Sequence, residues 1–254
     1  MKEISIEEFH KRYKDEFFRL VEFFKKYDIS YSLAFGSMIG AVREHDIIIW
    51  DPDIDLFLLH EDILKLREHK NELPEGFYFK SYLDYEENFG ISRVYIKGLC
   101  RDDGPSHEIR DAYFDLYHTF YVENDPELLL KVGKNIKRNV KKYWIKSSMA
   151  KPNIIKRTVR AVVRLFCPDI KKHIAYCTKE FSKLKPGKGK IVTMWFTRII
   201  KPMPFSDKLI EVPFGDKTCT VYDNYDEILT GIYGDYMTPH DEGQATGLKF
   251  YIEE

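Results

Sequence analysis

Three aspartates, Asp51, Asp53 and Asp55, occupy alternate positions immediately before an apolar run. Side chains two residues apart on a strand project to the same face, so a strand over residues 53–59 would bring Asp53 and Asp55 together. Paired carboxylates repel unless one is protonated or a cation lies between them, and their oxygens suit Mg²⁺ or Mn²⁺. A strand-entry turn with solvated carboxylates explains the same pattern, and the Asp53/Asp55 spacing alone favours that turn.

A turn at Gly36 and Ser37 strengthens the metal interpretation. It follows a predicted strand at residues 30–35 and precedes a predicted short helix at residues 37–44. Gly36 lets the backbone approach a ligand closely, and amides at a helix N-terminus bind phosphate. A phosphate cradle followed by two metal-binding carboxylates is typical of phosphoryl- or nucleotidyl-transfer sites. An ordinary turn explains Gly36 and Ser37 alone, but it explains the combination less well.

Asp115 is the best candidate for a third carboxylate. It is the lone acid of an aromatic strand predicted over residues 112–122. A buried carboxylate without a partner is strongly disfavoured by desolvation, which a shared metal ion would offset. A salt bridge to Arg93 would offset it too, so both interpretations stay open.

Two runs of the sequence resemble the LicD family. Residues 34–58, "AFGSMIGAVREHDIIIWDPDIDLFL", are similar to its Gly-Ser/Thr turn, its "GAVR" and its "WDxDID"; residues 225–240, "YDEILTGIYGDYMTPH", are similar to its closing motif. The similarity covers both ends of the chain in the right order, while the central region carries little recognisable signature. The family belongs to the nucleotidyltransferase-fold superfamily. Its members include bacterial phosphocholine transferases, and fukutin-type proteins are relatives.

The resemblance implies roles for the matching residues. Asp53, Asp55 and Asp115 would be the catalytic carboxylates that hold Mg²⁺ or Mn²⁺. Gly36 and Ser37 would contact the phosphates of the donor.

For the other matching residues, a role in the site and a structural role are both consistent with the sequence. Arg43, from "GAVR", would stabilise phosphate charge or support the aspartate strand. Asp235 and Tyr236 would line the substrate pocket, or they would serve only to end a helix. Pro52 stands where the family often has an acid, so the inner acids remain while the role of Asp51 as an outer ligand stays open.

The activity implied by the resemblance is transfer of a phospho-alcohol, with phosphocholine favoured, from a CDP-linked donor such as CDP-choline. The acceptor would be a hydroxyl of a cell-surface glycan, lipopolysaccharide or teichoic acid precursor, lipid-linked or free, and CMP would be released. One alternative is a true nucleotidyltransferase that uses an NTP and releases pyrophosphate through the same three carboxylates. Another is a non-catalytic module of this fold that binds glycans or membranes.

The elements that must position these residues alternate irregularly along the chain. Residues 5–28 are predicted to form an amphipathic helix with Ser5 and Glu8 as a capping box. Residues 61–70 and 224–234 are predicted helices, and residues 77–83 and 91–97 are strands able to form a hairpin. This order predicts an α+β fold with a nucleotidyltransferase-like mixed sheet flanked by helices.

Three segments are predicted: a catalytic core at residues 1–125, a basic helical segment at 126–204 with a break near Lys151 and Pro152, and a C-terminal segment at 205–254 that packs back on the core. From Lys131 to Lys172 the chain holds 14 lysines and arginines but one acid, Asp169, which is a net charge of +13 against −14 for the remainder. A basic face of this kind suits an anionic membrane or glycan, or packs on the acidic body. Nucleic acid is not an expected partner, because no binding motif accompanies the charge.

The remaining composition predicts a cytoplasmic protein, with a possible peripheral position at the inner face of the membrane. No run approaches the roughly 18 apolar residues that span a bilayer, and the N-terminal residues are charged throughout. The four cysteines form no CxxC pair, which predicts reduced thiols rather than a zinc ribbon or a disulfide framework: Cys100, Cys167, Cys177 and Cys219.

Overall fold

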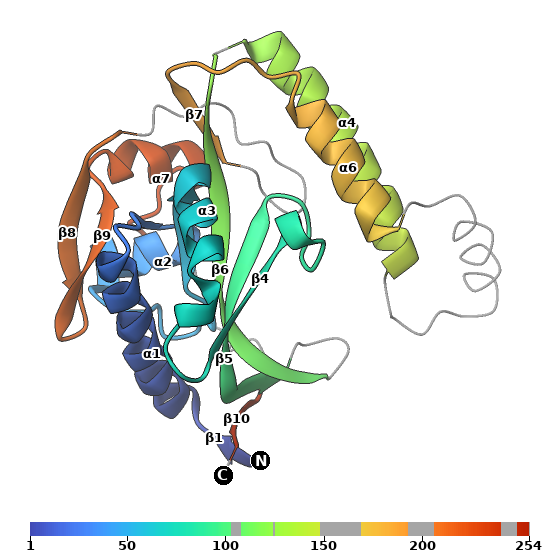
Figure 1. Cartoon of the computed structure of the whole chain (residues 1–254). Helices are drawn as coiled ribbons and strands as arrows, with labels where there is room; N and C mark the ends of the chain where they lie inside the picture. The colour runs from blue at the N-terminus through green and yellow to red at the C-terminus, as the bar shows by residue number, and fades with distance from the viewer. Residues whose placement is uncertain (103–107, 124, 148–168, 193–205, 240–247, 254) are drawn as a thin grey trace.

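The computed structural model describes residues 1–102, 108–123, 125–147, 169–192, 206–239 and 248–253 (Figure 1). Within these residues, one mixed sheet has the order β1-β10-β5-β6-β3-β2, with β4 paired to β5 and β7 to β6. β3 and β6 are parallel, and the other neighbours are antiparallel. Helices flank the sheet, so the predicted α+β class is confirmed. The strands are β1 (Lys2–Ile4), β2 (Ser32–Leu33), β3 (Asp55–Leu59), β4 (Phe77–Ser81), β5 (Ile91–Asp102), β6 (Ile109–Val122), β7 (Gly189–Val192) and β10 (Phe250–Ile252).

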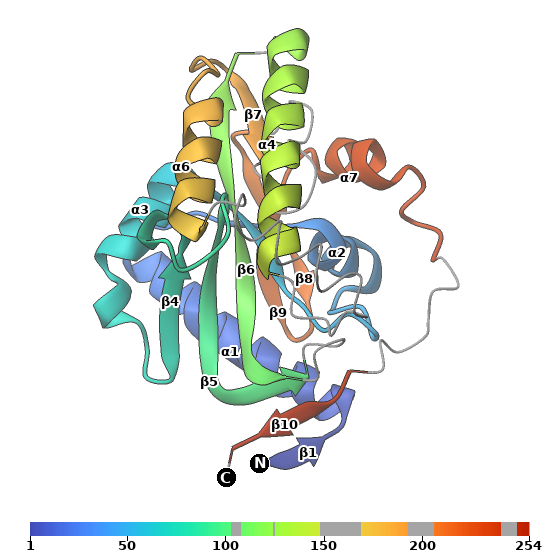
Figure 2. The same cartoon turned by 90° about the vertical axis from the view of Figure 1, so that its right-hand side faces the viewer.

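One face of the sheet is covered by α1 (Ile6–Lys26), which lies behind β4, β5 and β6 in Figure 2. The Ser5 hydroxyl accepts the N–H of Glu8 and caps this helix, as predicted. On β6, Phe114 is fully buried, and its ring stacks on that of Tyr13 from α1 at 4.8 Å. Residues of the opposite parity on β6, such as Asp115, therefore face away from α1.

The start of β3 differs from the prediction. The strand begins at Asp55, so the predicted strand start at residue 53 is wrong. Pro52 has no N–H to donate, the Asp51 carboxylate accepts the N–H of Asp53 at 3.3 Å, and the Ser37 hydroxyl accepts that of Asp55 at 2.8 Å. Side chains therefore hold residues 51–54 as a turn, and strand alternation applies only from Asp55 onward.

The remaining elements are short helices and a second, two-stranded sheet, β8–β9. The predicted helix at residues 37–44 is present as α2 (Phe35–Ile39) and the π-helical turn η1 (Gly40–Glu44), and the predicted hairpin is present as β4 and β5. β9 contacts β2 through Tyr222, whose N–H donates to the Ser32 hydroxyl at 3.2 Å. The other elements are α3 (His60–Glu68), η2 (Lys70–Glu72), η3 (Tyr82–Asp84), β8 (Leu209–Phe214), β9 (Lys217–Tyr222) and α7 (Tyr225–Tyr233).

Two long helices, α4 (Pro126–Ser147) and α6 (Ile170–Phe181), pack side by side and project beyond the sheet (Figures 1 and 2). A second apolar cluster joins them to the sheet, with Val132, Ile136, Ile174 and Cys177 among its buried members. The predicted break near Lys151 and Pro152 lies outside the described residues, and the three segment boundaries stay predictions. None of the helices described is both long and apolar enough to cross a bilayer.

Candidate active site

Four charged residues form a row across the sheet face opposite α1. The strand register aligns Lys80 of β4 with Arg93 of β5, Arg93 with Asp115 of β6, and Asp115 with Asp55 of β3. Directly paired residues on neighbouring strands project to the same side. Two cations therefore occupy one half of this charged row, and two carboxylates occupy the other.

Asp55 is the least compensated carboxylate of the charged row. Burial, the charge of Asp115 and the charge of Asp51 raise the pKa of Asp55 well above its usual range, while Arg93 opposes the shift. The described residues supply its carboxylate with no hydrogen-bond donor, although the side chain is partly exposed. A divalent cation at this point would relieve the like-charge repulsion.

Asp115, in contrast, is paired. Arg93 donates from Nε to the Asp115 carboxylate at 2.6 Å and from Nη1 to that of Glu87 at 3.0 Å. The Tyr95 hydroxyl also donates to Glu87, at 2.5 Å. The salt bridge that was the alternative explanation of Asp115 is therefore present, and it holds a guanidinium group beside the Asp55–Asp115 pair.

The turn before β3 separates Asp53 from Asp51. The carboxylate of Asp53 forms an ion pair with Arg101, whose Nη1 also donates to the carbonyl of Pro52 at 3.2 Å. The negative charge of Asp51 instead raises the pKa of Asp55. Burial raises the pKa of Asp51 itself to about 6, although the charge of Arg101 opposes this shift. The sequence leaves undecided whether Asp51 contributes to the metal site, and the structure shows that its charge acts on Asp55.

Gly36 and Ser37 support this turn. A Cβ added at Gly36 would lie 2.5 Å from Oδ2 of Asp51, so only glycine allows that carboxylate its position. Ser37 is buried, and its hydroxyl accepts the N–H of Asp55 at 2.8 Å and donates to the carbonyl of Asp53 at 3.4 Å. Gly36 and Ser37 therefore hold the aspartates in place, and their predicted contact with donor phosphates stays a prediction.

The predicted metal ligands are only partly brought together. Within the described ranges, no three His, Cys, Asp or Glu side chains lie close enough to form a complete metal-ligand set. Mg²⁺ keeps several waters and needs only one or two protein carboxylates alongside substrate phosphates. Asp55 and Asp115 on adjacent strands, with Asp51 in their field, fit that requirement because all are oxygen ligands and Asp55 lacks a compensating donor.

A cavity of about 510 Å³ opens beside the charged row. Arg93 and Arg101 line it, and each guanidinium carbon lies 4.3 Å from the ring centre of Tyr113. Tyr113 also belongs to an aromatic row with Tyr95 and Tyr78, at ring distances of 5.3 and 4.8 Å. Lys80 and Arg110 add positive charge to the lining, and Asp53, Glu86, Glu87 and Asp102 add negative charge. Guanidinium groups in such a pocket match the geometry of phosphate oxygens.

The C-terminal motif is tied to the "GAVR" segment rather than to this cavity. Arg43 donates from Nη1 to the carbonyl of Tyr236 at 2.7 Å, and the Tyr236 hydroxyl donates to Asp226 at 2.8 Å. Asp235 accepts from the hydroxyl of Thr238 at 2.7 Å. None of Arg43, Asp235 and Tyr236 lines the cavity beside Arg93, and their predicted substrate contacts stay predictions.

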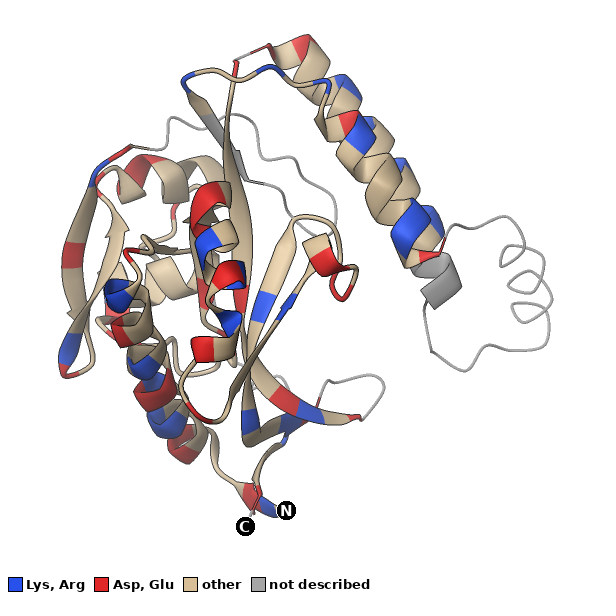
Figure 3. Cartoon of the chain, viewed as in Figure 1, with Lys and Arg blue, Asp and Glu red and all other residues tan. Residues whose placement is uncertain are grey.

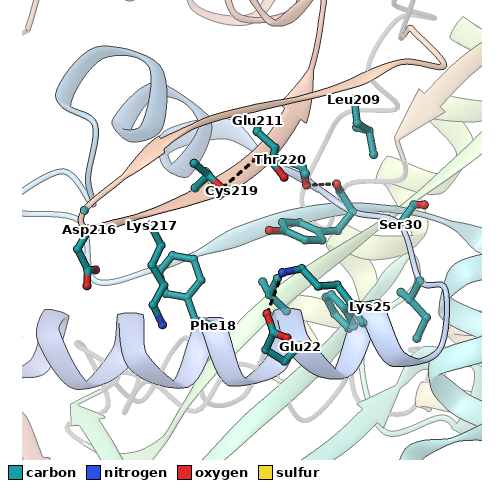
Figure 4. Close-up of a pocket in the computed structure, with 16 residues that line it drawn as sticks. Phe18, Glu22, Lys25, Ser30, Leu209, Glu211, Asp216, Lys217, Cys219 and Thr220 are labelled. Carbon is teal, nitrogen blue, oxygen red and sulfur yellow. Dashed lines mark hydrogen bonds and ion pairs between the residues drawn. The ribbon is translucent and has the colours of Figure 1, made fainter.

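A larger cavity, of about 750 Å³, lies between α1 and the β8–β9 hairpin (Figure 4). Phe18 and Lys25 of α1 and Cys219 and Thr220 of β9 line it, together with other residues that include none of the predicted site residues. A group whose pKa is strongly shifted by burial and by specific charged neighbours marks a candidate reactive site, and Asp55 of the charged row is such a group. The charged row with its smaller cavity is therefore the candidate active site.

The sequence prediction does not include Arg101 or Tyr113. Alternation along β6 puts Tyr113 on the Asp115 face, so its position could be found from sequence. Arg101 carries no such signal, because the pairing of β5 with β6 shifts register between Ile96 and Cys100.

Comparison with known proteins identifies the family of this chain. Residues 28–154, half of the chain, match the family described as "LicD/FKTN/FKRP, nucleotidyltransferase domain". The chain is 26% identical over 243 residues, 87% of each protein, to the lipopolysaccharide cholinephosphotransferase LicD of Haemophilus influenzae. It is also 27% identical over 106 residues, 35% of this chain and 39% of the relative, to an uncharacterized protein of Rickettsia prowazekii. The whole charged row falls within the matched residues, and the chain belongs to the LicD/FKTN/FKRP family.

Proposed function

We propose that this chain transfers a phospho-alcohol, with phosphocholine favoured, from a CDP-linked donor to a hydroxyl of a cell-surface glycan or teichoic acid precursor, releasing CMP. The similarity to a cholinephosphotransferase that acts on lipopolysaccharide supports the choline and the glycan. The observation that carries the proposal is Asp55, whose carboxylate has no hydrogen-bond donor among the described residues, next to Asp115. Arg93, the ion-pair partner of Asp115, lines the cavity of about 510 Å³ together with Arg101.

The arginines of the cavity bind the donor diphosphate in this proposal. Arg93 and Arg101 are each held by a carboxylate and by the Tyr113 ring, so their guanidinium groups are positioned before a ligand arrives. Preorganised cations of this kind stabilise charge that develops during phosphoryl transfer. Mg²⁺ or Mn²⁺ held by Asp55 and Asp115, with Asp51 as the outer carboxylate, would neutralise further charge on the phosphates and on the departing CMP.

The acceptor hydroxyl attacks the phosphorus that bears the alcohol, and the bond from that phosphorus to CMP breaks. The hydroxyl proton passes to Asp115, whose carboxylate is held in place by the Nε of Arg93 at 2.6 Å. Asp115 faces away from α1, toward the side of the sheet where the cavity opens. A substrate bound by Arg93 would therefore lie within reach of this base.

The test is a donor screen that follows CMP by phosphorus NMR, with CDP-choline and other CDP-alcohols, Mg²⁺ and candidate glycan acceptors. CMP should form with CDP-choline and an acceptor, and Asp115→Asn should abolish it. Asp216→Asn, which removes one exposed carboxylate on the β8–β9 turn, is the matched control and should keep full activity. No CMP from any CDP-alcohol would reject the proposal, and pyrophosphate release from NTPs would show a nucleotidyltransferase instead.

A further inference from the structure

The α4–α6 hairpin, by which we mean only the two packed helices α4 and α6, presents a basic outer surface. On α4 the six cations at positions 131, 134, 137, 138, 141 and 142 are all exposed, and their spacing of three and four residues puts them on one side of the helix. Val132 and Ile136 occupy the opposite, buried side. Glu127 is the single acid of α4, and no described carboxylate forms an ion pair with any of these six cations. Within the described part of the chain, no ion pair therefore compensates the positive charge of this face.

The second helix continues the basic surface. Lys171, Lys172 and Lys179 of α6 are exposed. The buried acid of this helix, Glu180, forms an ion pair with Lys183 and accepts a hydrogen bond from the side chain of Asn135. Figure 3 shows Lys and Arg along both helices, in contrast to α1, where both signs alternate. Both helices of the hairpin thus turn positive charge outward.

Two exposed apolar side chains lie within this basic surface. Leu130 is 76% exposed and sits one helical turn before Lys134. Tyr176 is 39% exposed and lies between Lys172 and Lys179 on the outer side of α6. The other apolar groups of the hairpin named above are buried in the second apolar cluster, so packing among the described residues does not account for these two.

We propose that the α4–α6 hairpin binds the surface of an anionic lipid bilayer. The cations lie against lipid phosphates, and Leu130 and Tyr176 enter the boundary between headgroups and acyl chains. Helices that combine a basic face with exposed apolar side chains bind bilayers in this way. A soluble polyanion would match the cations but would leave Leu130 and Tyr176 in water, which is why a bilayer fits better. This proposal does not depend on the transferase activity.

Vesicle flotation of the full chain tests the proposal, with phosphatidylcholine vesicles that contain or lack phosphatidylglycerol. Binding should require the anionic lipid and weaken as salt rises, because surface charges are screened. The triple variant Lys134→Glu, Arg138→Glu, Lys141→Glu should bind at least about 100-fold more weakly, given the contribution of each basic residue near a charged surface. The control Lys11→Glu, Lys97→Glu, Lys208→Glu makes the same charge change at exposed sites outside the hairpin and should bind far better than the triple variant.

The apolar contribution is tested separately. Leu130→Ser should weaken vesicle binding about tenfold, while Leu64→Ser, at a 42% exposed leucine of α3, should leave it unchanged. Leu130→Trp should show a blue-shifted emission relative to the unsubstituted chain when anionic vesicles are added. Circular dichroism confirms that each variant is folded. Equal binding to neutral vesicles, unchanged binding of the triple variant, or binding to heparin without binding to vesicles would overturn the proposal.

Discussion

The charged row of the sheet and the basic surface of the hairpin use the same residue types in opposite ways. Arg93 has a side chain only 16% exposed and two carboxylate partners, whereas Arg138 on α4 is exposed and has no carboxylate partner among the described residues. A buried arginine is positioned by its partners, and losing it leaves their charges uncompensated. An exposed cation contributes little to folding but adds to a field that reaches about a Debye length into solvent. The first arrangement suits chemistry at one point, and the second suits attraction to a broad surface.

After the loss of activity expected for Asp115→Asn, the largest expected effect is at Asp55. Asp55→Asn should lower CMP release by about a thousandfold or more, since a metal ligand contributes several kcal/mol to charge stabilisation. The same change should stabilise the metal-free fold at neutral pH. The raised pKa of Asp55 means that folding favours its protonated form, so stability is lost as pH rises and the ionised group costs free energy.

Thermal unfolding with and without Mg²⁺ separates these two effects. Mg²⁺ should raise the melting temperature of the wild-type chain and leave that of Asp55→Asn nearly unchanged. An equal rise in both proteins would contradict a metal role for Asp55.

Arg93→Ala should cost about 3 kcal/mol of unfolding free energy, because Asp115 and Glu87 would lose their shared cation in a largely buried place. Arg138→Ala removes the same group from the hairpin and should change stability by less than about 0.5 kcal/mol. Urea unfolding at neutral pH measures both. An equal loss of unfolding free energy in both variants would contradict the proposed difference between the buried Arg93 and the exposed Arg138.

Gly36→Ala should cost about 1–3 kcal/mol, since the new methyl group would meet the Asp51 carboxylate at 2.5 Å. The same carboxylate accepts the N–H of Asp53, so the substitution should also disturb the turn and lower activity. Combining it with Asp51→Ala removes the clash. A double-mutant cycle should therefore show that the two changes in the free energy of unfolding do not add, and simple additivity would speak against the close contact.

A smaller, pH-dependent effect is expected in the hairpin. Burial lowers the pKa of His173 to about 4, so the folded chain keeps this side chain neutral while the unfolded chain protonates it near pH 6.5. Stability should therefore fall as the pH drops from about 6.5 to about 4, by on the order of 1 kcal/mol or more. His173→Gln cannot titrate and should reduce that slope.

His118 provides the comparison within the sheet. It is fully buried, and burial together with His60 lowers its pKa well below the usual value, so it adds a slope of the same sign. The slope should therefore shrink in His173→Gln without vanishing. Urea unfolding across this pH range measures the wild-type chain and His173→Gln.

Much of the fold is readable from local patterns. The capped helix α1, the β4–β5 hairpin and the alternation along β6 all follow from periodicity and turn chemistry, because each depends on neighbours close in sequence. The candidate site is less readable. Asp55 and Asp115 are register partners on β3 and β6, as the alternation of side chains along each strand permits. The position of Asp51, in contrast, depends on the turn before β3 and on its contact with Gly36, 15 residues away in the chain.

By itself, the sequence determined the composition of the site and of the basic surface: the aspartates, the glycine turn and the positive stripes at helical spacing. Only the tertiary structure decided which charges face each other. It set Arg93 beside Asp115, Arg101 beside Asp53, and Arg43 on the carbonyl of Tyr236 across 193 positions of the chain. The reason is physical: side-chain periodicity is local, whereas strand register, bulges and ion-pair partners depend on contacts between distant segments.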